Sequence, residues 1–123
     1  MKRWLFKTEP SAYSFERLLK DGRTVWDGVA NALALKHLRQ VRKGDEIAIY
    51  HTGSVKAVVG VARAAADAGG DAVEIVPLHP VGPVSLASLK ADPRFRDFAL
   101  VRMGRLSIMP VPAPLWAPLL GGR

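Results

Sequence analysis

The sequence predicts one α+β domain over residues 1–123, a curled β architecture of about five to six strands flanked by short helices. Two observations support this fold class. The strand-like segments are short and mixed with short helical segments, and glycine or proline separates most of them. This pattern favours a small α+β fold over a parallel βαβ sheet. A length of 123 residues is enough to bury a core as a single domain.

The first strand is predicted at residues 4–8, with a short helix after it. Pro10 ends the strand because proline has no N–H to donate and holds the residue before it extended. Ser14 has the side chain of a helix N-cap, and the helix is expected to run to residue 19 with its apolar residues on one face. Gly22 then ends the helical segment.

A loop, a basic helix and a second strand are expected next. Residues 25–28 are predicted to form a loop with a sharp turn at its glycine. Asn31 is placed to start a helix whose apolar residues recur at helical spacing. A turn at residues 44–45 leads to a strand at residues 46–50, in which Tyr50 is predicted to face away from the two isoleucines.

Two further strands are predicted in the middle of the chain, at residues 56–64 and 72–78. Gly60 lies within the first of them, where a glycine often marks a bulge or a close backbone approach. Pro77, Pro80 and Pro83 are expected to end the regular pairing of the second strand. Later segments are one or two helical turns at 85–89, a charged helix or loop at 93–98, a strand at 106–109 and a helix at 112–120.

The residue composition narrows the function classes. The chain has no cysteine, which excludes disulfides, cysteine–zinc clusters and thiol catalysis. Its three histidines are spread along the sequence without metal-ligand spacing, so no metal or other cofactor is expected. The sequence also lacks a nucleophile elbow, a glycine-rich phosphate loop and a deaminase signature. These absences disfavour an enzyme.

The net charge is +7 at pH 7, with basic residues clustered at 36–43 and 94–105. A basic balance favours polyanionic partners through counterion release, although it also serves solubility alone. No apolar run approaches the ~20 residues that cross a bilayer. We do not expect the N-terminus to be a signal peptide, because charged residues soon interrupt its apolar residues. We expect a soluble, cytoplasmic protein without a membrane partner, and the oligomeric state is not predicted.

Several short motifs follow one another along most of the chain. They are WLFKTEP at 4–10, WDGV at 26–29 with Asn31 behind it, LR at 38–39, GD at 44–45, YH at 50–51, RLS at 105–107 with Pro110 behind it, and Trp116. Their order and spacing resemble the EVE domain family, a member of the PUA-like superfamily of small barrels. The chain departs from the family at residues 30–35, which read ANALAL where the family usually shows RNYQAR.

The resemblance implies a PUA-like pseudobarrel with a pocket that opens on one side. Related YTH and ASCH domains bind RNA or modified bases, and EVE domains are associated with modified bases in DNA or RNA, without an assigned catalytic activity. The resemblance therefore implies a non-enzymatic module whose partner is nucleic acid, either RNA or DNA. One base, modified or not, would enter the pocket, and a basic surface would hold the backbone. The departure at residues 30–35 leaves the identity of that base open.

Six residues are candidates for this base pocket. Trp26 offers a flat surface for base stacking, worth ~1–3 kcal/mol, although a core tryptophan fits the same position. Asn31 has a donor and an acceptor for a base edge and suits a helix N-cap equally well. Tyr50 and His51 are candidates for stacking and donation, or for half-buried packing at a strand end. The full set is Thr8, Trp26, Asn31, Tyr50, His51 and Ser107.

Four basic residues are candidates for contact with phosphates. Lys7 ends the first predicted strand, and Arg105 shares a strand face with Ser107. Lys36 and Arg39 lie on a helix whose basic face is also explained by solvation. The alternative function is an enzyme acting on a small nucleotide or nucleoside, and a protein-interaction module is a third possibility. The acid–base candidates for the enzyme are Glu9, Asp27 and His51.

Overall fold

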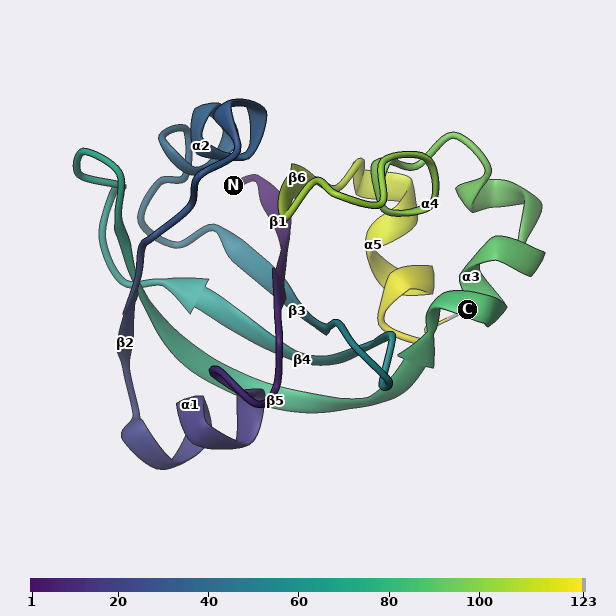
Figure 1. The fold of residues 1–123 in the computed structure, drawn as a ribbon, viewed down its shortest axis with the longest axis horizontal. Helices are drawn as coiled ribbons and strands as arrows, with labels where there is room; N and C mark the ends of the chain where they lie inside the picture. The colour runs from purple at the N-terminus through teal and green to yellow at the C-terminus, as the bar shows by residue number, and fades with distance from the viewer. Residues whose placement is uncertain (123) are drawn as a thin grey trace.

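One curled sheet organises residues 1–122, which are the residues that the computed structural model describes. Within this range six strands lie in the order β2-β5-β4-β3-β1-β6, and five short α-helices and one 3-10 helix surround them (Figure 1). The strands are β1 (Arg3–Thr8), β2 (Thr24–Trp26), β3 (Glu46–His51), β4 (Ala57–Ala64), β5 (Val73–Ser85) and β6 (Ile108–Pro110). The predicted α+β class and curled sheet are confirmed.

The helices cover different parts of this sheet. In Figure 1, α2 lies above the sheet, α1 lies below it, and α3, α4 and α5 gather at one end. None of the helices within the described range is long and apolar enough to cross a membrane. Their bounds are α1 (Phe15–Asp21), α2 (Ala32–Leu38), α3 (Leu86–Ala91), α4 (Ala99–Arg102) and α5 (Ala113–Leu119), with the 3-10 helix η1 at Pro93–Phe95.

Strand β1 lies inside the sheet, with a parallel neighbour on one side and an antiparallel neighbour on the other. It pairs in parallel with β3, from Arg3 opposite Glu46 to Thr8 opposite His51. On its other side it pairs with β6, where Phe6 lies opposite Ile108. The end of β1 therefore leaves the sheet beside the segment that leads into β6, and this arrangement builds one wall of the site described below.

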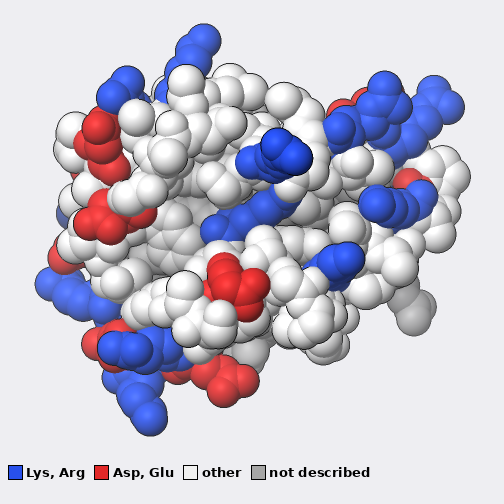
Figure 2. All heavy atoms as spheres, viewed as in Figure 1, with Lys and Arg blue, Asp and Glu red and all other residues white. Residues whose placement is uncertain are grey.

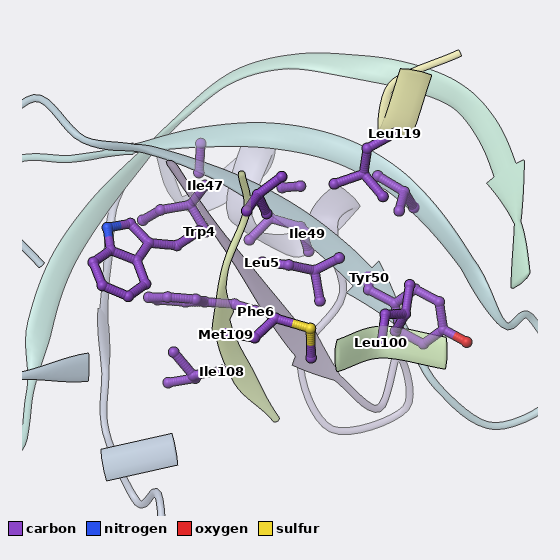
Figure 3. Close-up of a cluster of buried hydrophobic side chains, with 14 of the residues drawn as sticks. Trp4, Leu5, Phe6, Ile47, Ile49, Tyr50, Leu100, Ile108, Met109 and Leu119 are labelled. Atoms are coloured by element: carbon purple, nitrogen blue, oxygen red, sulfur yellow. The ribbon is translucent and has the colours of Figure 1, made fainter. Parts of the chain in front are cut away.

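The core fills both faces of the central strands. The side chains of β1, β3 and β6 meet there, and Figure 3 shows Phe6 below Trp4 and next to Met109. Trp4 is anchored because its indole N–H donates to the buried Asp45 carboxylate at 2.9 Å. Tyr50 lies beside Leu100 in Figure 3 and is only 3% exposed. The face of β3 that carries Tyr50 is therefore buried as well.

Local capping explains where the first helices begin and end. The Ser14 hydroxyl accepts the Arg17 N–H, and Gly22 ends α1 with a positive φ of 78°. The Asn31 side chain accepts the Ala34 N–H at 2.9 Å, which makes it the N-cap of α2. The predicted starts of both helices are thus confirmed.

Helix α1 packs against β4 at Gly60. A Cβ built on this glycine would lie 2.5 Å from ring carbons of Phe15, far inside van der Waals contact. The predicted close approach at Gly60 is therefore confirmed, and its partner is the first residue of α1.

The prediction of a loop over residues 25–28 is wrong in its first two residues. Thr24–Trp26 forms β2, which pairs with β5 from Thr24 opposite Ile75 to Trp26 opposite Val73. Three residues are too few to show a periodic pattern, and the pairing depends on a strand that lies almost fifty residues away. The sharp turn lies at Gly28 as predicted, two residues after the strand ends, where φ is 72°.

The prediction that prolines end the strand after residue 78 is also wrong. Strand β5 runs on through Pro77, Pro80 and Pro83 to Ser85. The prolines are tolerated because β2 pairs with β5 only at residues 73–75, so beyond them one edge of β5 needs no donors from the described strands. The register between β4 and β5 also shifts twice along this stretch. Helix α4 was not predicted, and β6 begins two residues later than expected.

Candidate functional site

A cleft of about 440 Å³ opens between the end of β1 and the strand β2. One wall consists of Lys7, Thr8 and Glu9, and the other of residues 24–30. Tyr13 and Ser107 complete the lining. Figure 2 shows a hollow left of centre on the face drawn in Figure 1, with basic side chains along its right-hand border. Three predicted base-pocket residues, Thr8, Trp26 and Ser107, line this one cleft.

Trp26 is both a packed residue and a lining residue of the cleft. Its ring lies 5.4 Å from the Phe6 ring, with an interplanar angle of 51°. The Tyr13 ring lies 6.4 Å from it in an edge-to-face arrangement, with an interplanar angle of 89°. These two contacts restrict the ring, while the half-buried side chain still borders the cleft. A rigid aromatic surface of this kind is suited to stacking on a flat ligand.

Tyr13 is a lining residue that sequence reasoning missed. Its backbone carbonyl accepts the Thr8 hydroxyl at 2.8 Å, and its own hydroxyl donates to Asp21 at 2.9 Å. Desolvation raises the pKa of the Tyr13 hydroxyl, and the Asp21 carboxylate raises it further. The signal available in the sequence was weak, namely an aromatic residue directly before the Ser14 cap.

Lys7 places a cation in the wall of the cleft. Its ammonium donates to the Gly104 carbonyl at 3.0 Å and lies 5.8 Å from the centre of the Tyr50 ring. Burial lowers the pKa of this ammonium from its ordinary value. Because the Lys7 backbone N–H also donates to Ser107 at 2.8 Å, this residue joins β1 to the segment before β6.

Two carboxylates also border the cleft. Glu9 accepts the Ser11 hydroxyl at 3.2 Å and the Thr52 hydroxyl at 3.3 Å, so its carboxylate holds together the turns at both strand ends. Asp27 is exposed and follows Trp26 at the end of β2. The cleft thus offers a cation, hydroxyls and a carboxylate acceptor around one aromatic face. Among the described residues, no group of three or more His, Asp or Glu side chains is placed to hold a metal ion.

The EVE domain family model matches residues 2–121. The chain belongs to the EVE domain family. No curated protein sequence matches it.

Several solved structures are similar to this chain in fold. An NMR structure of a Rhodopseudomonas palustris protein is 33% identical, has a TM-score of 0.91, and the match covers 98% of this chain and 92% of that one. Human THYN1, solved in complex with DNA containing 5-methylcytosine, is 22% identical, also has a TM-score of 0.91, and the match covers 98% and 96% of the two chains. An ASCH protein mutant from Zymomonas mobilis matches over 98% of both chains, with 14% identity and a TM-score of 0.58. The predicted PUA-like architecture is confirmed.

Three predicted base-pocket residues of the EVE domain lie outside the cleft. The Asn31 carboxamide oxygen caps α2, and the residue borders a second hollow next to the cleft. The His51 Nε2 accepts the Phe15 N–H at 3.0 Å, and burial lowers the pKa of its imidazole while Glu16 and Glu9 oppose the shift. A neutral His51 therefore serves as an acceptor within the fold. Tyr50 is buried beneath Lys7.

The four predicted phosphate contacts are also separated by the fold. Lys7 lines the cleft, and Arg105 lines the adjoining hollow. Lys36 borders another cleft, of about 560 Å³, near the start of β1. Arg39 is engaged by Asp71, with its Nε at 2.9 Å and its Nη2 at 2.6 Å from the same carboxylate oxygen. Of these four residues only Lys7 lines the cleft with Trp26, and Arg105 lines the hollow beside it.

Proposed function

We propose that this EVE domain is a non-enzymatic nucleic-acid-binding module that accepts one DNA or RNA base, a modified one in its natural target, in the cleft beside Trp26. The observation that carries the proposal is the ring of Trp26, which is restricted by its contacts with Phe6 and Tyr13 and lines the cleft. Stacking on such a ring contributes ~1–3 kcal/mol per base. The DNA complex of human THYN1, which shares the fold, supports this partner class.

The polar lining suggests how a base would be oriented. A carboxylate accepts hydrogen bonds from the exocyclic amino group of cytosine, so Asp27 favours a base that carries an amino group. Thr8 uses its hydroxyl proton on the Tyr13 carbonyl, which leaves its oxygen free to accept. Ser107 adds a hydroxyl at the β6 side of the cleft. A base that leaves these groups unpaired would bind less tightly.

The arrangement of titratable groups favours binding over catalysis. Of the three acid–base candidates, His51 is buried and accepts a backbone N–H within the fold. Glu9 is held by Ser11 and Thr52. Glu9 and Asp27 are exposed at the cleft, whereas His51, the one histidine among the three candidates, is engaged inside the fold.

Binding to short oligonucleotides tests the proposal. The panel contains plain and methylated cytosine and adenine in DNA and in RNA, measured at two salt concentrations. We expect a preference for one base that persists at the higher salt concentration, because stacking and hydrogen bonds in a cleft are screened less than surface charges. Binding that ignores the base and disappears with salt would contradict a base-accepting cleft.

The Trp26→Leu variant tests whether the preference for one base comes from the cleft. Leucine keeps an apolar side chain against Phe6 but removes the stacking surface, so affinity for the preferred oligonucleotide should fall about fivefold or more. The matched control is Trp116→Leu, a half-buried tryptophan on α5 that stacks with Arg3 and does not line the cleft. Thermal unfolding of both variants checks that they fold. Unchanged affinity in a folded Trp26→Leu protein would refute the assignment.

A further inference from the structure

A second hollow, of about 350 Å³, lies next to the base cleft. Two large apolar side chains border it and remain open to solvent, with Leu33 38% exposed and Met103 46% exposed. Exposed apolar side chains gathered in one hollow indicate a contact surface more strongly than the same residues scattered singly. The full lining is Asn31, Leu33, Met103, Gly104, Arg105 and Leu106.

At two places in the chain, a residue that lines the cleft is followed or preceded directly by one that lines the hollow. Ala30 lines the cleft and the next residue, Asn31, lines the hollow. Likewise Leu106 lines the hollow and the next residue, Ser107, lines the cleft. Consecutive Cα atoms are about 3.8 Å apart, so the backbone of the cleft continues directly into the backbone of the hollow at two places.

The charge on these walls suits a polyanion. The sequence has no acidic residue in 28–44 or in 98–122, the two segments that supply every residue of the hollow. Arg105 lines the hollow, and Arg102 is exposed one turn earlier, in α4. Lys7 lies between the two spaces, because it lines the cleft and its ammonium donates to the Gly104 carbonyl of the hollow. The acidic residues Glu9 and Asp27 border the cleft alone.

From this continuity and charge we infer that the hollow is a second nucleotide subsite, which takes the nucleotide adjacent to the one in the cleft. Leu33 and Met103 contact the face of the flanking base, and Arg105 contacts the phosphate between the two nucleotides. Apolar contact with a base face is indifferent to base identity, so the subsite adds affinity and not sequence preference. This inference rests on the proposed function of the cleft.

Oligonucleotides with an abasic flank test the subsite. The preferred base is kept, and the flanking nucleotide is made abasic on the 5′ side in one single strand and on the 3′ side in another. We expect affinity to fall about fivefold or more at one of the two positions, since a base contact is lost while every phosphate is retained.

The Leu33→Ala, Met103→Ala double variant then locates the lost contact. It should bind the intact strand as weakly as the wild type binds the abasic strand, and it should no longer distinguish the two strands. Both side chains are exposed, so the fold should survive. Leu78→Ala is the matched control, because Leu78 is 37% exposed on β5 away from the hollow, and it should keep the wild-type ratio.

The outcomes separate the subsite from the cleft. Equal binding of intact and abasic strands, together with a loss in Trp26→Leu, would overturn the subsite and leave the base cleft in place. A double variant that still distinguishes the strands would also overturn it. Failure of the wild type to bind any oligonucleotide would overturn both the subsite and the proposed function.

Discussion

Trp26 shows how a single side chain serves the core and the cleft together. Its contacts with Phe6 and Tyr13 restrict the ring, and a ring that is already restricted loses little freedom when a ligand stacks on it. Asn31 differs, because its carboxamide oxygen is committed to the Ala34 N–H. A ligand at Asn31 would have to use the amide nitrogen or displace the cap. Trp26 and Asn31 therefore have different freedom to bind a ligand.

His51 gives a pH prediction at the same scale. Burial lowers the pKa of this imidazole below the ordinary value of 6.5, so the unfolded chain binds more protons than the native protein just below pH 6.5. The stability from neutral His51 is fully present above pH 6.5 and is lost as the pH falls towards the lower native pKa. We expect the free energy of unfolding to decrease from pH 7 to pH 5, measured by urea denaturation.

The His51→Gln variant tests the cause of that decrease. Glutamine retains an oxygen that can accept the Phe15 N–H but does not titrate, so its unfolding free energy should depend less steeply on pH. His37 also has a pKa lowered by burial, with Lys36 adding to the shift, and His37→Gln should remove only its own share. A His51→Gln protein with the pH slope of the wild type would show that another group is responsible.

At the scale of the elements, structure that depends on neighbouring residues was predicted better than structure that depends on residues far apart in the sequence. The helix starts at Ser14 and Asn31 were predictable because an N-cap side chain bonds to a backbone N–H only three residues further along the chain. Strand β2 and the end of β5 were not, because they depend on pairing between segments far apart in sequence. The same division applies to the site. Sequence motifs marked Thr8, Trp26 and Ser107, whereas Tyr13 joins them only through the folding of α1 against the sheet.

The contact between α1 and β4 gives a prediction for an element pair. In Gly60→Ala the new methyl group would meet the Phe15 ring at 2.5 Å, so the ring and α1 must shift. Overpacking of this kind costs about 1–3 kcal/mol of unfolding free energy, measurable by chemical denaturation. Gly82→Ala on β5 is the control, since a Cβ there meets nothing within 4 Å, and its effect should stay below about 0.5 kcal/mol.

A second background distinguishes overpacking from backbone effects. In Phe15→Leu the smaller side chain leaves room for a methyl group at Gly60, so the added cost of Gly60→Ala should shrink. An equal cost in both backgrounds would mean that the glycine is needed for its backbone conformation and not for the space it leaves to α1.

Charge is distributed unevenly over the whole molecule. The net charge is +7, yet several arginines are neutralised locally, as Arg39 is by Asp71 and Arg94 is by Asp92. Figure 2 shows basic side chains to the right of the hollow, over the right-hand end and at the lower left, with acidic ones mainly at the left, along the lower edge and near the centre. Net charge alone therefore overstates the number of cations available to a polyanion at the cleft.

The salt dependence of binding measures how many of these cations meet phosphates. For single strands, each neutralised phosphate contributes about 0.7 to the slope of log affinity against log salt concentration. Arg105→Ala should lower the affinity, and it should reduce the magnitude of this slope by about 0.7, the value for one phosphate contact, because Arg105 lines the hollow next to the cleft. Arg39→Ala should leave the slope nearly unchanged, because Asp71 already holds that guanidinium. An equal change of slope in the two variants would mean that the surface of α2 contributes to binding as much as the edge of the cleft does. The bound nucleic-acid strand would then run across both.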